Sequence, residues 1–374
     1  MSGPLDELRA RLAEGADLRR AAALLGWEQR VTMPPRGTDA RADQLATLGR
    51  IAHERFVDDE VGRLLDAAEP LVEKLPYDSD DRSLVRVTRR DWEKARRIPT
   101  PLREEMTREA ARGHHAWVEA RRNNDFASFL PYLRKNVDLK RRYIECFDWS
   151  DSPYTPLLDD YEPGMLTTDV REVFAVLRPA LTEIVGSAPE IDASFLRGAF
   201  PPDQQRAFAE RVVATLGFES GAWRIDPTAH PFCTSFTNRD VRLTTRYQPD
   251  DLESVWSTLH EAGHGLYAHG IADSLLRTPL DSAPSLGVNE SQSRTWENLV
   301  GRSRPFWEHW YEPLQETVPT LGSVELEQEL IEGTVPLEDL PEVWNARMKE
   351  FLGVDVPSDS DGVLQDVHLS LIHI

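Results

Sequence analysis

The segment from His260 to His264 reads His-Glu-Ala-Gly-His and constrains this chain more than any other feature. Residues four apart lie on one face of an α-helix, about one turn apart, so both imidazoles can reach a single tetrahedral zinc ion. Glu261 is one position round from His260, where its carboxylate can take a proton from a metal-bound water without binding the metal. The pattern therefore predicts a helix that carries a zinc site.

Such a site needs a third protein ligand and an open fourth position. Glu290 is predicted to be this ligand because it follows a short loop downstream, at the start of another helical pattern. The alternative is a buried helix whose two histidines bond only to carbonyl and carboxylate oxygens. An apolar stripe of Leu252, Val255 and Leu259 runs beside the histidine stripe, which favours the metal site over that alternative.

Long helices dominate the rest of the predicted structure. Helical patterns cover residues 5–25, 38–68, 80–97, 101–122, 126–144, 168–185, 202–216 and 324–332. They predict antiparallel helices joined by short loops. An aromatic segment from Phe306 to Tyr311 has the helical spacing that is typical of core packing.

One short segment has the alternation of a β-strand. Residues 240–247 place Val241 and Leu243 on one side and polar side chains on the other, and residues 238–240 could turn a hairpin. We therefore expect an all-α, mainly helical fold with a small sheet bordering the active-site groove, where a strand edge could bind a peptide backbone. Two interpretations of Arg242 stay open, namely an ion pair with Asp240 or another carboxylate, and contact with a substrate.

Charge and composition exclude several classes of function. The net charge of −21 would repel a phosphate backbone, so no nucleic-acid partner is expected. We expect no membrane partner, because the chain contains no apolar run of about 20 residues. Two cysteines without a spacing pattern do not form a disulfide framework, and no secretory signal opens the chain, so a cytoplasmic protein is predicted. Cys233 is interpreted as a small buried apolar residue rather than a nucleophile.

Several motifs, in order, resemble the M32 family of zinc carboxypeptidases. The segments His-Glu-Ala-Gly-His-Gly and Asn-Glu-Ser-Gln-Ser-Arg-Thr-Trp-Glu-Asn are typical of it. His-Pro-Phe at residues 230–232, Asp-x-Arg-x-Thr at 240–244 and Gly-x-x-Gln-Asp-x-His at 362–368 also match, with Leu369 where the family has Trp. The resemblance covers nearly the whole chain.

The resemblance implies an activity and roles for residues. It implies hydrolysis of single amino acids from the free C-terminus of peptides, with one Zn²⁺ per chain, which Co²⁺ could replace. His260, His264 and Glu290 would hold the metal and Glu261 would act as the general base. His230 would either help to polarise the scissile carbonyl or cap the chain beside Pro231. Gln365 and His368 would line the floor of the cleft.

The family also implies a zincin-like helical shell with a deep groove, and a homodimer. Two rival hypotheses remain. A zinc oligoendopeptidase or dipeptidyl carboxypeptidase of a related helical fold would share the His-Glu-x-x-His motif and a downstream Glu. An inactive zinc-binding fragment would bind metal without turnover.

Two departures from the family pattern lie toward the end of the sequence. A segment of some tens of residues that carries Ile-Arg-x-x-Ala-Asp in the family is missing between about Gly322 and Glu327, and residues 369–374 do not continue the pattern. We therefore expect one metallocarboxypeptidase domain over residues 1–374 that is C-terminally incomplete. It would comprise an N-terminal helical part, 1–150, and a zinc-binding catalytic part, 151–374. An exposed apolar surface, instability and weak activity are the expected consequences.

Overall fold

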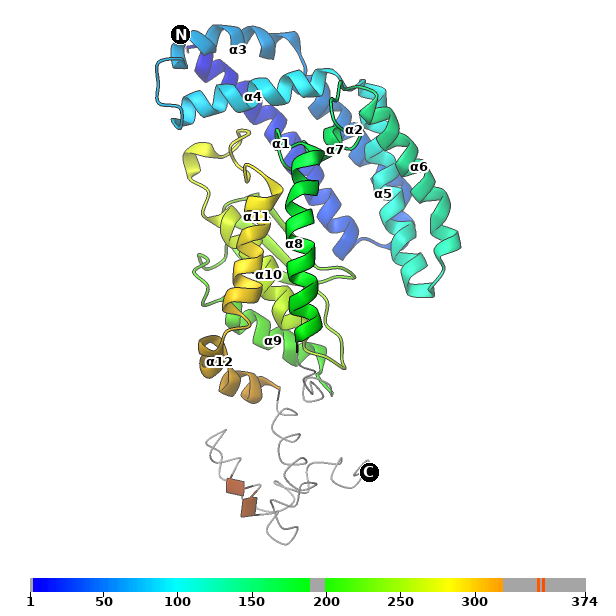
Figure 1. Cartoon of the computed structure of the whole chain (residues 1–374), viewed down its shortest axis with the longest axis vertical. Helices are drawn as coiled ribbons and strands as arrows, with labels where there is room; N and C mark the ends of the chain where they lie inside the picture. Colours follow the sequence, from blue (N-terminus) through cyan, green and yellow to red (C-terminus); the bar gives the residue numbers. More distant parts are fainter. Residues whose placement is uncertain (1–2, 189–198, 319–341, 344, 347–374) are drawn as a thin grey trace.

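The computed structural model describes residues 3–188, 199–318, 342–343 and 345–346 (Figure 1). The prediction of a mainly helical protein with a small sheet is confirmed. The first helices are α1 (Pro4–Val31), the 3-10 turn η1 (Pro35–Gly37), α2 (Thr38–Phe56), α3 (Asp59–Val72), α4 (Asp80–Arg96), α5 (Thr100–Asn123) and α6 (Phe126–Ile144).

The predicted single helix over residues 38–68 is wrong, because the chain breaks between α2 and α3. Asp58 has an extended backbone (φ −55°, ψ 140°), and its side chain accepts a hydrogen bond from the N–H of Glu60. An aspartate in this position caps the next helix by satisfying one of its free amide groups. Residues 56–59 contain neither glycine nor proline, so helical apolar spacing on both sides of the break does not mark it.

The second half of the chain contains the sheet and the helices around it. Its elements are α7 (Thr155–Leu158), α8 (Thr167–Ser187), α9 (Pro202–Val213), β1 (Trp223–Pro227), β2 (Cys233–Thr237), β3 (Asp240–Thr245), α10 (Glu253–His269), the 3-10 turn η3 (Asp273–Leu275), α11 (Leu286–Arg294), the π-helical turn η4 (Thr295–Val300) and α12 (Arg304–Thr317). The predicted hairpin is confirmed, because β2 and β3 pair antiparallel. Strand β1, which the sequence analysis does not predict, lies parallel to β3 and makes the order β1-β3-β2.

Helix α10 lies at the centre of the second half (Figure 1). One side of it packs on α9 and α12 through Leu259, Phe208 and Trp310, which are all buried. Another side packs on the sheet, where Ala262 joins Val241 and Leu243 in a second buried cluster. The aromatic segment of α12 therefore belongs mainly to the core, as its spacing predicts.

The N-terminal helices contact the sheet through α1. Arg20 of α1 donates a hydrogen bond of 2.6 Å to the carbonyl oxygen of Ser235 on β2, and it forms an ion pair of 3.1 Å with Asp281. Three residues earlier in α1, Asp17 pairs with Arg277. These contacts join the start of the chain to segments more than 200 residues downstream.

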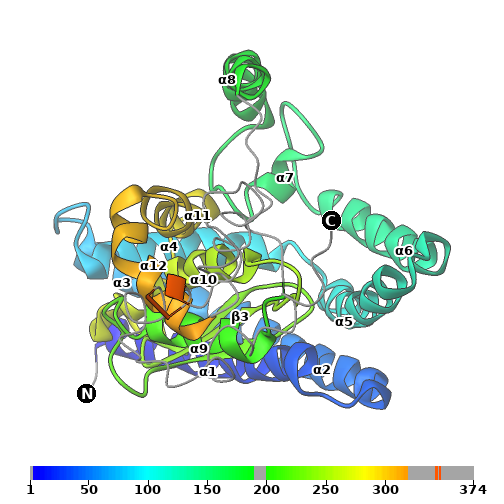
Figure 2. The ribbon, with the colours of Figure 1, turned by 90° about the horizontal axis from the view of Figure 1, so that it is seen from below.

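Helices α6 and α8 leave apolar side chains exposed. In Figure 2, α8 stands away from the rest of the described structure. The apolar side chains exposed on α8 are Val173, Phe174, Val176, Leu177, Leu181, Ile184 and Val185. The apolar stripe that predicts α6 is also partly exposed, at Phe126, Leu133 and Val137. Among the described helices, none is long and apolar enough to cross a membrane.

Candidate metal centre

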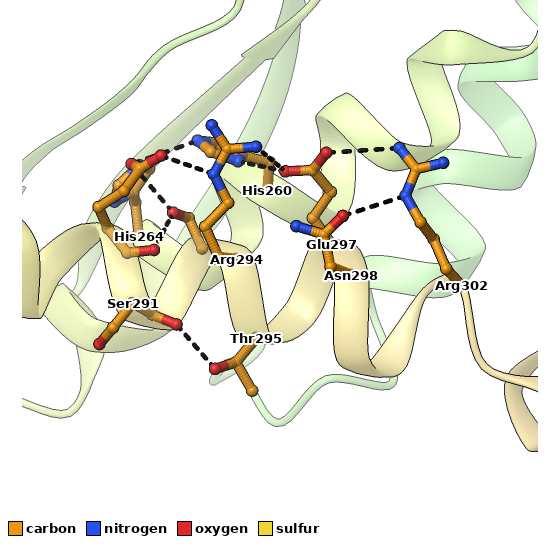
Figure 3. Close-up of polar contacts among 10 residues, drawn as sticks. His260, His264, Ser291, Arg294, Thr295, Glu297, Asn298 and Arg302 are labelled. Carbon is orange, nitrogen blue, oxygen red and sulfur yellow. Dashed lines mark hydrogen bonds and ion pairs between the residues drawn. The ribbon is translucent and has the colours of Figure 1, made fainter. Parts of the chain in front are cut away.

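Three predicted metal ligands lie together where α10 and α11 meet. Two of them, His260 and His264, are labelled in Figure 3. His260 and His264 project from the same face of α10, with their ring centroids 5.0 Å apart. Glu290 projects from α11, and its Oε2 lies 3.6 Å from Nε2 of His260 and 3.3 Å from Nε2 of His264. Three ligand atoms thus converge on one point, within 4.8 Å of one another.

The close approach of α10 and α11 depends on Gly263. A Cβ atom at this position would lie 2.6 Å from Cα of Ser293 and 2.7 Å from the carbonyl oxygen of Gln292. Ser293 is fully buried at this contact, and its hydroxyl lies 3.1 Å from Oε2 of Glu290. The glycine between the two histidines therefore lets α11 approach closely enough to bring Glu290 to them.

Glu297 orients the ring of His260. Its Oε2 accepts a hydrogen bond of 2.8 Å from Nδ1 of His260, so in the neutral ring the free lone pair is on Nε2, which faces Glu290. Arg294 bridges the two acids, donating to Oε1 of Glu290 at 2.9 Å and to Oε2 of Glu297 at 3.0 Å (Figure 3). Sequence reasoning did not predict this role of Glu297, because it depends on how α10 packs against α11 and η4 in the fold.

The residues present fit a divalent metal ion. Two imidazoles and one carboxylate form the ligand set of many catalytic zinc sites, and a carboxylate behind one histidine is the usual support for such a ligand. Burial lowers the pKa of His264, and the neighbouring His260 lowers it further, which favours the neutral ring that a metal requires.

Glu261 lies on the adjacent face of α10, toward the sheet. Its side chain is buried, and burial, with a smaller effect of the Glu290 charge, raises its pKa to about 8 in the absence of a metal. A backbone hydrogen bond from Cys233 on β2 opposes this rise. The strand next to α10 thus holds the carboxylate that the sequence predicts to be the general base.

Comparison with known proteins identifies the family. The family model described as "Carboxypeptidase Taq (M32) metallopeptidase" matches residues 7–324 and 323–373. The chain belongs to the M32 family. The M32 chain is therefore a metallopeptidase of the carboxypeptidase type.

Relatives with names and structures agree with this assignment. Thermostable carboxypeptidase 1 of Thermus thermophilus is 38% identical over 405 aligned positions, which cover 95% of this chain and 79% of the relative. Carboxypeptidase 1 of Bacillus subtilis is 29% identical, covering 93% and 77%. The crystal structure of M32 carboxypeptidase from Deinococcus radiodurans is 36% identical with a TM-score of 0.73, covering 98% of this chain and 81% of that chain.

The two matched segments of the M32 chain meet at residues 323 and 324. This junction falls where the sequence analysis expects a missing family segment. The alignment to the Thermus relative, at 405 positions, is also longer than the 374 residues of this chain, so the relative has positions without a counterpart here.

Arg242 of the M32 chain forms one of its two expected contacts. Its guanidinium pairs with both carboxylate oxygens of Asp240, at 3.0 and 3.2 Å, and stacks on Trp27 and Phe236. The described contacts thus include the ion-pair alternative, while contact with a substrate stays a prediction. In the same motif, Thr244 hydrogen bonds the backbone of Phe232 and so ties the strand to the His-Pro-Phe segment.

His230 lies apart from the metal cluster, in a cavity of about 310 Å³. Its ring meets that of Trp117 edge-on at 6.3 Å, and the ring of His114 lies 5.9 Å from that of Trp117. None of the contacts described for His230 reaches the three ligands, so its role in the reaction stays a prediction.

Gln365 and His368 lie outside the described residues, as does the predicted helix over residues 324–332.

The surroundings of Cys233 and His269 indicate structural rather than catalytic roles. Burial raises the pKa of the Cys233 thiol, which packs among the apolar residues between the sheet and α10, so the thiol is a poor nucleophile. Both ring nitrogens of His269 are engaged, Nδ1 by the carbonyl oxygen of Asn238 and Nε2 by the N–H of Glu219. These two hydrogen bonds indicate a structural role for His269.

Proposed function

We propose that this M32 metallocarboxypeptidase uses one zinc ion, held by His260, His264 and Glu290, to release single amino acids from the C-terminus of peptides. The observation that carries the proposal is the convergence of three ligand atoms within 4.8 Å, with Nε2 of His260 left free by its bond to Glu297. The same ligands suit Co²⁺.

Glu261 is proposed as the general base. When bound, the ion supplies Lewis acidity, which lowers the pKa of a coordinated water and polarises a carbonyl. Glu261 takes the proton of the attacking water and returns it to the leaving amine. Its buried position beside β2 supports this role, because a carboxylate with a raised proton affinity is a stronger base.

The substrates are proposed to be peptides with a free C-terminus, as the names of the relatives indicate for those proteins. His230 is proposed to assist at the scissile carbonyl, and Arg242, Gln365 and His368 are proposed to contact the substrate. A homodimer in the cytoplasm is proposed on the family resemblance.

The first test is the metal content of the purified chain, measured by elemental analysis. We expect about one zinc per chain in the parent, far less in Glu290→Ala, and a full complement in Glu312→Ala, which removes an exposed carboxylate on α12. A folded parent chain that binds no zinc would refute the ligand assignment.

The second test separates the reaction classes. The parent chain should release the terminal residue from a peptide with a free C-terminus and leave the amidated peptide intact. Glu261→Gln should keep its zinc and lose turnover by at least about 100-fold. Cleavage of the amidated peptide would favour an endopeptidase, and zinc without turnover would favour an inactive fragment.

A further inference from the structure

The loop between α7 and α8 contacts the start of α11, the helix that carries Glu290. The backbone carbonyl oxygen of Tyr161 accepts a hydrogen bond of 2.8 Å from the amide of Leu286. The side chain of Glu162 accepts one of 2.5 Å from the amide of Gly287, through its Oε1. Glu162 and Gly287 are 125 positions apart in the sequence, so this contact exists only in the folded chain.

The contacts with the loop complete the N-terminal cap of α11. The first amides of a helix have no partners within the helix itself. Here the amides of Leu286 and Gly287 bond to the loop, and the amide of Val288 bonds to the hydroxyl of Ser285 at 3.2 Å. A carboxylate at the start of a helix also interacts favourably with the helix dipole. Glu162 therefore stabilises the first turn of α11 from outside the helix.

Apolar packing contributes little to the position of this first turn. Its side chains Leu286 and Val288 are 51% and 43% exposed. Of the nine residues of α11, all of which the structure describes, only Ser293 is buried. A helix of this length is not stable without contacts to the rest of the protein. The position of the first turn therefore depends on its polar contacts with the loop.

The loop is itself anchored to the N-terminal helices. Asp159 and Asp160 both pair with Lys94 of α4. Asp160 also accepts a hydrogen bond of 2.6 Å from the hydroxyl of Tyr143 on α6. Within the loop, the carboxylate of Asp159 accepts one of 2.8 Å from the amide of Gly164. Because these bonds hold the loop on both α4 and α6, its side chains can support α11.

Glu290 lies between the two points at which α11 is held. Gly287 precedes it by three residues, and Ser293, which packs on Gly263 of α10, follows it by three. Residues three apart are neighbours on the surface of a helix. A shift or rotation of the first turn would therefore carry the Glu290 carboxylate away from the two histidines of α10.

We propose that Glu162 is a positioning residue of the metal centre. By accepting the hydrogen bond from Gly287, it fixes the start of α11 and keeps the carboxylate of Glu290 in place for the ion. Glu162 acts through the helix and is not itself a ligand. This inference rests on the proposed function, in which Glu290 holds the metal.

The zinc affinity of variants of the full chain, measured by competition with a chelator, tests the proposal. Glu162→Ala should raise the dissociation constant at least about tenfold, because α11 loses a charge-assisted hydrogen bond. Glu162→Gln should recover most of this loss, since its amide oxygen can accept the same bond. Asp58→Ala is the matched control, because it removes a bond of 2.9 Å to the amide of Glu60 in α3, a helix that carries none of the three ligands.

Hydrogen exchange of the metal-free proteins provides a second measurement. The amides of residues 286–290 should exchange at least about tenfold faster in Glu162→Ala than in the parent, and at the parent rate in Asp58→Ala. Urea unfolding of both alanine variants measures the loss of global stability. A local effect on α11 is thereby separated from a general destabilisation that would weaken any site.

The outcomes separate this inference from the proposed function. Parent-like zinc affinity in Glu162→Ala, or an equal loss in Asp58→Ala, would overturn the positioning role. The role would also be overturned if Glu162→Gln bound zinc as weakly as Glu162→Ala, or if exchange at the start of α11 were unchanged. A parent chain that binds no zinc refutes the proposed ligands instead, and exchange in the metal-free proteins then decides whether Glu162 holds α11.

Discussion

At the scale of single residues, His260 stands between two carboxylates that act on different ring nitrogens. Glu297 accepts from Nδ1, and Glu290 faces Nε2. A histidine can offer only one lone pair in its neutral form, so the bond to Glu297 determines which nitrogen is available. Arg294 and Arg302 in turn hold Glu297 in place.

Loss of Glu297 should weaken metal binding without removing a ligand. We expect Glu297→Ala to raise the dissociation constant for zinc about 10- to 100-fold, because His260 loses the group that fixes its tautomer and orientation. Competition with a chromogenic chelator measures the constant. Asn298→Ala is the matched control, since Asn298 contacts Arg302 from the same helical turn. Equal affinity of the two variants would contradict the positioning role.

His53 should make the stability of the N-terminal helices depend on pH. Its ring is buried and bonds to the carbonyl oxygen of Ile98 at 3.1 Å, and burial lowers its pKa below the usual 6.5. Because the folded state disfavours the charged ring, this contribution to stability is present above about pH 6.5 and is lost as the pH falls below that value.

The measurement is the melting temperature of the parent and of His53→Gln between pH 7.5 and 5. We expect the advantage of the parent over His53→Gln to narrow as the pH falls, since glutamine can keep the bond to Ile98 without gaining a proton. His309→Gln, an exposed substitution on α12, is the control. A constant difference across the range would show that His53 does not titrate with folding.

At the scale of elements, α10 is held between two partners that both approach it at glycines. Gly263 faces α11, and a Cβ at Gly265 would lie 2.9 to 3.0 Å from side chains of β3 and Phe218. The helix thus meets Glu290 of α11, the predicted ligand, on one face and the sheet on another. The two glycines of His-Glu-Ala-Gly-His-Gly are requirements of packing, while the histidines and Glu261 are the residues for which we propose chemical roles.

Gly263→Ala should damage both the fold and the site. The added methyl group would meet the backbone of Ser293, so we expect a loss of about 1–3 kcal/mol in the free energy of unfolding, with weaker zinc binding as α11 moves away. Gly26→Ala in α1 is the control, because no atom lies within 4 Å of its Cβ position. That variant should gain about 0.5–1 kcal/mol from helix propensity. Urea unfolding measures both, and a neutral or stabilising Gly263→Ala would refute the packing argument.

The sequence predicts elements well and their partners poorly. The helix of His260 and His264 follows from local spacing, and so does the strand of Val241 and Leu243. The role of Glu297 depends on how α10 and α11 meet, which no local pattern contains. The sequence does not predict strand β1, because its parallel pairing with β3 arises only in the folded chain. The cap at Asp58 was readable in principle, since an aspartate before an acidic first turn is a helix-start signal.

At the scale of the whole molecule, α6 and α8 each carry several exposed apolar side chains, in a protein whose net charge is −21. A helical pattern shows that a face is apolar, but not what covers it. Contiguous exposed apolar surface favours association. Among the described residues, α6 and α8 carry such side chains. The expectation that missing family segments expose an apolar surface stays a prediction.

Charged residues on α8 should reduce association at little cost in stability. Val176 and Val185 are each 75% exposed, so Val176→Lys with Val185→Lys removes apolar surface without opening a core. We expect less light scattering at high protein concentration and a melting temperature within a few degrees of the parent. Leu71→Lys on α3, which is 58% exposed, is the control and should leave scattering unchanged. Unchanged scattering in the α8 variant would locate the association elsewhere.

The contact between α1 and β2 has a consequence for how the protein is made. Arg20 meets Ser235 across 215 residues of chain. At ribosomal rates of about 5–20 residues per second, roughly 10 to 40 s separate the synthesis of the two segments. During that interval α1 can pack only on the other N-terminal helices, among them α2, α3 and α4, so its contacts with the sheet form last. Chaperone dependence in the cell would then be set by the order of the elements along the chain as much as by their final stability.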